Sequence, residues 1–205
     1  YPIAIALSND AVKLAVSMIN INEGSVKSTI AFYNYGTVGQ NEIDHCVGVN
    51  NYDDMVIPEM EFTSNDRMVA FGDTKAVIFE GAQKPQAIAE IPMDEKTKSI
   101  FYNEHYIGIV TGNEDEAVTN HLAVYDENGK LVMEKDFGLD YSSIEFLTNN
   151  EICIRNANVC DIYTVHGVYK FHHEFEEELF EIIPGKLKLN YTLVLKDTTQ
   201  RIRLK

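Results

Sequence analysis

Apolar and polar residues alternate along this chain in short runs, and the same succession of runs recurs. The first repeat has an apolar run at Ile3–Leu7, a polar turn, a second run at Leu14–Met18 and a third at Ile30–Tyr33. A period of two in short runs bounded by turn residues predicts β-strands. We therefore expect this repeat to form four antiparallel strands, with the fourth around Ile43 to Val49.

The succession returns four more times along the chain. The second repeat starts with the run Met60–Phe62, the third with Ile100–Tyr102, the fourth with Ile144–Leu147 and the fifth with Leu179–Ile183. Equivalent strands are on the order of 40 residues apart, which is the period of a four-stranded propeller blade. The fifth repeat has only three runs, and the last of them is Arg201–Leu204.

The sequence therefore predicts an all-β fold, a β-propeller of four-stranded antiparallel blades in which the fifth repeat is incomplete. We expect one propeller or partial-propeller domain, with approximate blades at residues 1–55, 56–96, 97–140, 141–178 and 179–205. A propeller hides the edges of its sheets, and an N-terminal strand commonly completes the last blade of a closed ring. We therefore expect N-terminal blades and the closing strand to lie outside this chain, which would be the C-terminal part of a larger propeller.

Turn and loop residues agree with this division. Asn128-Gly129 lies between two apolar runs, and this dipeptide supplies the positive φ angles of a tight hairpin. His166-Gly167 occupies the equivalent place one repeat later. Long loops between second and third strands are expected at Asn20–Ser28 and Gly112–Asn120. The best helix candidate, Glu174–Phe180, is short and is better interpreted as a loop that leads into a strand.

The net charge of the chain limits the classes of partner that it can bind, but it says little about the fold. The 205 residues include 17 Lys and Arg against 32 Asp and Glu, which gives a formal charge of -15. A phosphate backbone or an anionic membrane surface is repelled by such a chain. We therefore expect no nucleic-acid partner and no membrane contact by these residues, whereas basic proteins, cations and neutral glycans are compatible with them.

Several segments resemble those of a bacterial protein family. They are Tyr1–Ser8, Phe32–Gly36 with Gly39–Asp44, and Val124–Asp126 with Gly129-Lys130. They are similar to an uncharacterised domain-of-unknown-function family whose members have quinoprotein-like or WD40-like β-propeller repeats, and the resemblance spans the chain. It implies an extracytoplasmic parent protein, tethered by an N-terminal membrane anchor absent from this chain. It implies no activity, because the family has no catalytic residues to carry over.

The motifs of propeller enzymes and of nucleotide sites are absent from the sequence. The chain has no Trp, whereas quinone-cofactor dehydrogenases, strict WD40 repeats and sialidase turns all use tryptophan. Neither a Gly-rich phosphate loop nor the motifs G-x-S-x-G and H-E-x-x-H occur. We therefore expect no enzyme activity and no cofactor.

Acidic clusters are the only suggestive chemistry. They lie at Asp53-Asp54, at Glu114–Glu116 and at Glu174 with Glu176–Glu178, and none has the spaced oxygen ligands of a calcium loop. Calcium is the one metal that these clusters leave open, and we expect no metal. His172 and His173 are adjacent on an expected strand, so they point to opposite faces and do not chelate one ion together.

The three cysteines are too few for a disulfide framework. Cys153 and Cys160 either face each other across a tight hairpin or pack separately in their strands, and Cys46 lies far from both in sequence. The sequence leaves both arrangements open, and with them the redox compartment.

Loops between second and third strands and connections between blades are expected on one rim of the disc. We expect a non-catalytic binding module, extracytoplasmic and at the cell surface, that recognises a protein or glycan through this loop-rich face. The alternative is a propeller hydrolase or lyase acting on an extracellular polysaccharide, which needs paired acidic residues that the sequence does not identify. The expected contact residues are Tyr52, Asp53, Asp54, Glu114, Asp115, Glu116, Asp140 and Tyr141.

Overall fold

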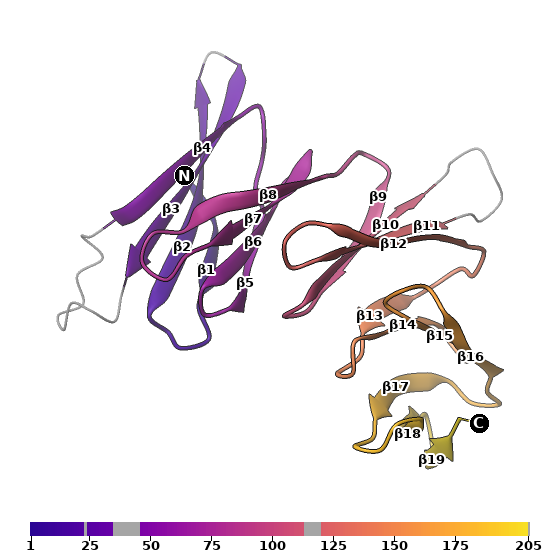
Figure 1. Ribbon diagram of the computed structural model, residues 1–205. Coiled ribbons are helices and arrows are strands. Elements are labelled where there is room, and N and C mark those ends of the chain that lie inside the picture. The colour runs from indigo at the N-terminus through magenta and orange to yellow at the C-terminus, as the bar shows by residue number, and fades with distance from the viewer. Residues whose placement is uncertain (23, 35–45, 113–119, 205) are drawn as a thin grey trace. The chain divides into compact units, whose positions relative to one another are not determined.

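The computed structural model describes residues 1–22, 24–34, 46–112 and 120–204, and every regular element among them is a β-strand (Figure 1). Sheet 1 contains β1 (Pro2–Leu7), β2 (Lys13–Asn22), β3 (Ser25–Asn34) and β4 (Cys46–Asp53). Sheet 2 contains β5 (Glu59–Ser64), β6 (Arg67–Phe71), β7 (Lys75–Glu80) and β8 (Gln86–Pro92). Sheet 3 contains β9 (Thr97–Tyr102), β10 (Tyr106–Gly112), β11 (Asn120–Asp126) and β12 (Leu131–Phe137).

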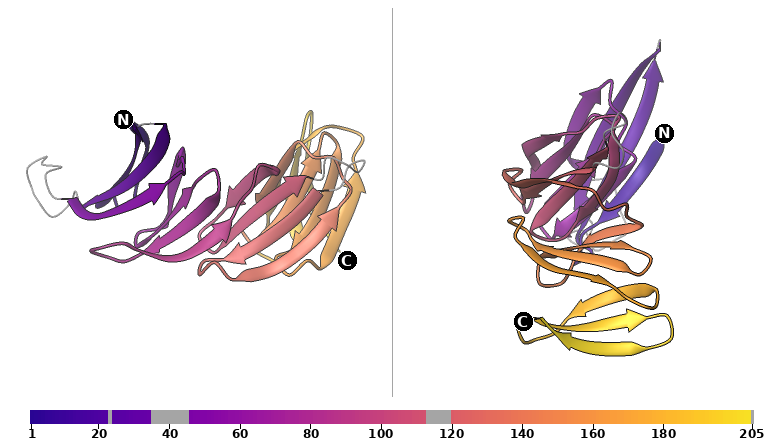
Figure 2. Two further views of the ribbon diagram at one scale, coloured as in Figure 1. Left: turned by 90° about the horizontal axis from the view of Figure 1, so that it is seen from above. Right: turned by 90° about the vertical axis from the view of Figure 1, so that its right-hand side faces the viewer.

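Sheet 4 contains β13 (Ser143–Phe146), β14 (Glu151–Asn156), β15 (Val159–Thr164) and β16 (Tyr169–Glu174). Sheet 5 contains β17 (Leu179–Pro184), β18 (Asn190–Leu195) and β19 (Thr199–Arg203). In every sheet the strands lie side by side in chain order and pair antiparallel, as the two views of Figure 2 also show. The expected all-β architecture of four-stranded antiparallel sheets is therefore confirmed. No helix in the described part of the chain is long and apolar enough to cross a membrane.

Two expectations for the first repeat need correction. Asn20–Ser28 is not a long loop, because β2 continues to Asn22 and β3 begins at Ser25 around a turn in which Gly24 has a φ of 84°. The fourth strand is β4, so it begins and ends later than the range expected from the sequence. Ile43 to His45, the start of that range, lies outside the described residues, as does most of the expected loop Gly112–Asn120.

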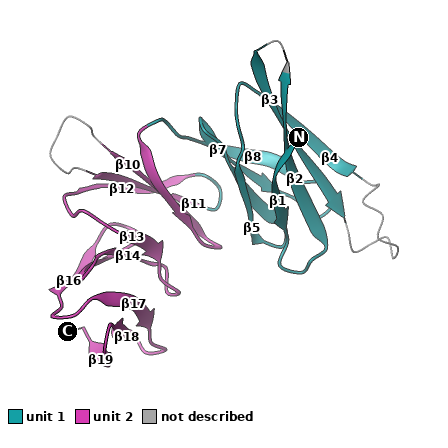
Figure 3. Cartoon of the chain, turned by 180° about the vertical axis from the view of Figure 1, so that it is seen from behind, with its two compact units in different colours: residues 1–95, 127–129 teal, residues 96–126, 130–205 magenta. Residues whose placement is uncertain are grey.

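The chain divides into two compact units (Figure 3). Unit 1 comprises residues 1–95 and 127–129, and it contains sheets 1 and 2. Unit 2 comprises residues 96–126 and 130–205, and it contains sheets 3, 4 and 5. In unit 1 the first strands of the two sheets, β1 and β5, contact each other, and in unit 2 β9 contacts β13.

The core of unit 1 lies between sheets 1 and 2. Side chains alternate along a strand, so β1 buries Ala6 and β3 buries Ile30 and Phe32 on the face that meets sheet 2. Phe32 packs against Phe79 of β7 with ring centroids 5.2 Å apart. Two face-to-face sheets thus share one apolar layer, which is the usual solution for antiparallel sheets with one apolar face.

The opposite face of sheet 1 carries one apolar row whose two ends are exposed. Ile5 pairs with Val16, Val16 with Ala31, and Ala31 with Val49, so one row of side chains crosses all four strands without a polar residue. Ile5 is 67% exposed and Val49 is 54% exposed. An uninterrupted apolar row of this kind is typical of a surface that packs against another protein surface.

Unit 2 has two apolar layers, one on each face of sheet 4. The layer between sheets 3 and 4 includes Phe101, Val124 and Ile152, and the layer between sheets 4 and 5 includes Ile162 and Leu193. The inner strands of sheet 4 are therefore buried on both faces within their own unit. Its strands β14 and β15 carry four buried residues each, as expected for a strand with no solvent-facing side.

Candidate functional site

The candidate site lies in unit 2, around the loop that joins β17 to β18. This loop, residues 185–189, borders two hollows of about 630 and 530 Å³. The larger hollow extends along β18 and β19 of sheet 5. The smaller one lies between the loop and sheet 4, where it meets the turn before β14 and the start of β16.

Exposed lysine and arginine side chains surround these hollows. No acidic side chain lines the larger hollow, and the one carboxylate that lines the smaller, Glu151, is neutralised by Lys170. No described residue forms an ion pair with any of the exposed cations. In a chain of formal charge -15 they form a local region of opposite sign. We call these residues the cationic site: Lys186, Lys188, Arg201 and Arg203.

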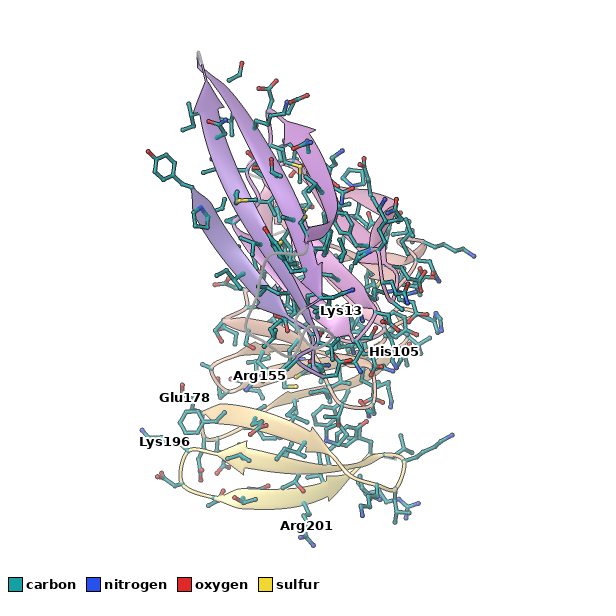
Figure 4. The ribbon with its side chains drawn as sticks, turned by 90° about the vertical axis from the view of Figure 1, so that its left-hand side faces the viewer. Lys13, His105, Arg155, Glu178, Lys196 and Arg201 are labelled. Carbon is teal, nitrogen blue, oxygen red and sulfur yellow. The ribbon has the colours of Figure 1, made fainter. Side chains whose placement is uncertain are left out.

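Local structure explains why these cations face outward. In β19 the middle residue Ile202 packs against the core layer between sheets 4 and 5, so its neighbours Arg201 and Arg203 point to the other face. Figure 4 shows Arg201 projecting away from the strands of sheet 5. The β17–β18 loop is held by a hydrogen bond in which the N–H of Gly185 donates to the carbonyl oxygen of Asn190 (2.7 Å).

A buried polar network lies beside the smaller hollow. Glu151 is 8% exposed, and its Oε1 pairs with the Nζ of Lys170. The hydroxyl of Tyr191 donates to Glu151 Oε2 at 2.6 Å, and Lys170 Nζ lies 3.2 Å from the same hydroxyl. Glu151 and Lys170 come from sheet 4 and Tyr191 from sheet 5, so the network ties the two sheets together next to the loop.

The network sets the protonation states of Tyr191 and Lys170. Burial, together with the hydrogen bond to Glu151, raises the pKa of Tyr191, so the phenol is protonated at neutral pH. Burial alone would lower the pKa of Lys170, but its hydrogen bonds to Glu151 and Tyr191 outweigh burial and raise that pKa. Lys170 is therefore a permanent cation, and Tyr191 is a poor general base.

The structure separates the expected contact residues into different units. Tyr52, Asp53 and Asp54 lie in unit 1, and Asp140 and Tyr141 lie in unit 2. Asp53 and Asp54 are exposed, and Asp53 forms an ion pair with Lys27 at 3.1 Å. Asp140 is also exposed. The other three expected residues, Glu114, Asp115 and Glu116, lie outside the described part of the chain.

Both expected tyrosines are packed rather than free. Tyr52 is half-buried against the core of unit 1, and burial, followed by the charge of Glu90, raises its pKa to about 12. The ring of Tyr141 packs against Phe137 with centroids 5.7 Å apart, and its hydroxyl lies 2.8 Å from Ser99 Oγ. Each tyrosine therefore contributes to its local fold, whatever it contacts outside.

The cationic site lies at the other end of sheet 4 from the expected rim. Tyr141 precedes β13, whereas Asn149, which lines the smaller hollow, follows it. The sequence held a signal for this end, because the last repeat has two acids, Glu181 and Asp197, against six lysines and arginines: Lys186, Lys188, Lys196, Arg201, Arg203 and Lys205. The net charge of the whole chain does not reveal that its last repeat is basic.

The described residues contain no group of three or more His, Cys, Asp or Glu side chains that could hold a metal ion. Two His–Asp contacts do occur. His172 Nδ1 lies 2.7 Å from Asp161 Oδ1, and His121 Nδ1 lies 2.7 Å from Asp136 Oδ1. Each is a pair between neighbouring strands of one sheet, which is a structural contact and offers too few ligands for a metal.

Comparison with protein families decides what the chain is related to. The model of the family of unknown function DUF5711 matches residues 1–204. The chain belongs to this family. A search of curated proteins found no match to the DUF5711 chain.

Solved structures that resemble the DUF5711 chain are propellers. The β-propeller domain of the Trilobed protease from Pyrococcus furiosus has a TM-score of 0.55 at 10% identity, over 98% of this chain and 70% of that domain. Kluyveromyces lactis Hsv2 has a TM-score of 0.52 at 11% identity, over 99% of this chain and 59% of Hsv2. The WD40 domain of Neurospora crassa Pan2 has a TM-score of 0.50 at 6% identity, with shares of 98% and 61%.

At these identities the likeness shows the fold alone. The predicted β-propeller class is confirmed, and the DUF5711 chain spans less than two thirds of Hsv2 and of the Pan2 domain. The β-propeller fold suggests a protein-interaction module, since a rigid scaffold of short strands presents loops at both ends of every sheet.

Proposed function

We propose that this chain is a non-catalytic interaction module whose cationic site binds an acidic segment of a protein partner. The observation that carries the proposal is the cluster of exposed cations without ion pairs to described residues, beside two hollows, in a chain of formal charge -15. Arginine and lysine clusters are a recurring device for recognising acidic motifs, because guanidinium and carboxylate groups form paired hydrogen bonds.

The surroundings of the cations favour a peptide over a sugar chain. Leu187 is 73% exposed beside both hollows, so apolar side chains of a peptide have a surface to pack against. The aromatic ring that lines the larger hollow, Tyr191, is only 2% exposed. Sugar rings commonly stack on an exposed aromatic ring, and no described residue lining either hollow offers one.

We place this interaction outside the cytoplasm, at the cell surface, because the resemblance to the propeller family implies an extracytoplasmic parent protein. The rival function, a polysaccharide hydrolase or lyase, needs two acidic groups that face one another across a substrate. In the described part of the chain the buried acids are Glu151 and Asp161, and each is paired with a side chain of its own sheet, Lys170 or His172. A binding role is therefore better supported than acid catalysis.

The first experiment measures binding of fluorescent poly-L-glutamate to the chain at low salt. Reversing three charges of the site (K186E, R201E and R203E together) is expected to weaken binding by at least about tenfold, because both charge and paired hydrogen bonds are lost. Binding by the unaltered chain should also fall as salt is added. Lys196→Glu is the control, since Lys196 is exposed in the turn between β18 and β19 and lines neither hollow.

Equal binding by the triple variant and the unaltered chain would contradict the proposal, as would an equal loss in the Lys196→Glu control. Heparin, a sulfated glycan, is used in a parallel titration. Tighter binding of heparin than of poly-L-glutamate would replace the protein partner by an anionic glycan. Far-ultraviolet circular dichroism of each variant checks that the strands are retained.

A further inference from the structure

Two thiols meet inside unit 2, away from the cationic site. Cys153 lies on β14 and Cys160 lies on β15, and their Sγ atoms are 3.7 Å apart. Both side chains have no exposed surface. The third cysteine, Cys46, is exposed in unit 1 and takes no part in this pair.

The strand register explains the approach of the two sulfurs. Cys153 is paired with Ile162 and Cys160 with Arg155, so the two cysteines are diagonal neighbours on one face of the β14–β15 ladder. The right-handed twist of a ladder shortens one of its two diagonals. At 3.7 Å the two sulfurs are in contact across their diagonal.

We propose that Cys153 and Cys160 are a modification site, at which an intramolecular disulfide joins β14 to β15. The bond requires the Sγ atoms to move from 3.7 Å to about 2.05 Å. The surroundings accept the product. The two sulfurs lie in the apolar layer with Ile162, Leu193 and Leu195, and a disulfide has no hydrogen-bonding need to satisfy there.

The oxidant is a low-molecular-weight disulfide such as oxidised glutathione. One cysteine, as its thiolate, attacks this disulfide, forms a mixed disulfide and releases one glutathione thiolate. The second cysteine, also deprotonated, then attacks the protein sulfur of the mixed disulfide and releases the second glutathione. Two electrons pass from the cysteine pair to the oxidant, and the two protons lost by the cysteines are taken up by the two glutathione thiolates.

Burial determines when this exchange takes place. The hydrogen bond to Cys153, together with burial, raises the pKa of the Cys160 thiol, and a protonated thiol does not attack a disulfide. The folded, reduced chain therefore exchanges slowly. The bond forms while the chain folds, when β14 and β15 have paired but sheet 5 has not yet covered them.

The test refolds the Cys46→Ala variant from denaturant with either oxidised or reduced glutathione. After refolding with oxidised glutathione, we expect the intact mass to be about 2 Da lower than that of the reduced protein. We also expect no thiol that reacts with Ellman's reagent in denaturant. The disulfide closes a short loop of the unfolded chain, so the oxidised protein should melt on the order of 5 °C higher than the reduced protein. Adding dithiothreitol after unfolding should restore both thiols.

Two controls keep the result interpretable. Adding Cys153→Ser to the Cys46→Ala variant leaves one thiol, which can gain glutathione but cannot lose mass. Circular dichroism confirms that the refolded samples contain β-structure. A stable glutathione adduct on the two-cysteine protein, or two free thiols after oxidised refolding into the native fold, would overturn the proposal, since either shows that the two sulfurs do not reach each other.

Discussion

Sheet 1 and sheet 5 each have an exposed face, and the two faces have opposite chemistry. The row of paired residues that crosses sheet 1 from Ile5 to Val49 is wholly apolar. A row of paired residues across sheet 5 runs from Ile183 through the polar Thr192 to the charged Arg201. The same strand arrangement thus supports two surfaces. An apolar face gains free energy by excluding water, and a charged face gains it by pairing ions and is weakened by salt.

The largest effect is expected from comparing the two faces of sheet 1 itself. Ile30 has no exposed surface, so Ile30→Ala should lower the free energy of unfolding by about 3 kcal/mol through lost burial and the cavity left behind. Ile5 is 67% exposed, so Ile5→Ala should change it by less than about 0.5 kcal/mol. Urea unfolding of both variants measures the difference. A large loss in Ile5→Ala would mean that the apolar face is covered in solution.

A smaller effect is expected at the charged end of unit 2. Glu151→Gln removes the carboxylate that Lys170 and Tyr191 share, leaving a partly buried cation without its counter-charge. We expect a loss of about 2 kcal/mol, moderated because the Lys170 side chain is 20% exposed. Hydrogen exchange should show the loosening in sheets 4 and 5. The matched change Glu181→Gln, at an exposed residue of β17, should leave exchange unaltered.

The smallest effect concerns alkaline pH in unit 1. The fold raises the pKa of Tyr52 from its ordinary value of 10.0 to about 12, so it favours the neutral phenol. That contribution is complete below pH 10 and is lost as the pH rises towards 12. Tyr52→Phe keeps the ring but cannot ionise, so the variant should lose less stability than the unaltered chain over this interval. If the urea midpoints of the two proteins fell by the same amount between pH 10 and pH 12, the hydroxyl of Tyr52 would not be buried as described.

Sequence patterns predicted the fold well where turn chemistry is local. Asn128-Gly129 was expected to form a hairpin, and Gly129 has a φ of 74° between β11 and β12. The prediction of a long loop at Asn20–Ser28 was wrong. There the alternation of Ile19 and Ile21 with polar residues continues the strand until Gly24 makes the turn.

The candidate site was harder to predict, because it depends on contacts between repeats. Glu151, Lys170 and Tyr191 each stand at the start of a strand, and nothing in their own neighbourhoods indicates that they meet. The meeting follows from the stacking of sheet 5 on sheet 4. The acidic loops are conspicuous in the sequence because each is one long, charged segment. The four cations are spread over two separate segments, the β17–β18 loop and β19, and come together only in the fold.

Strand β19 carries a safeguard against self-assembly. Among the described residues it is the outer strand of sheet 5, and an outer strand without a partner strand offers its backbone groups to any extended chain, including another copy of itself. Two copies aligned antiparallel about Ile202 would set Arg201 of each opposite Arg203 of the other, and like charges in directly opposed positions repel. Wherever this edge has no partner strand, the arginines that we propose for recognition would also disfavour pairing between copies of the chain.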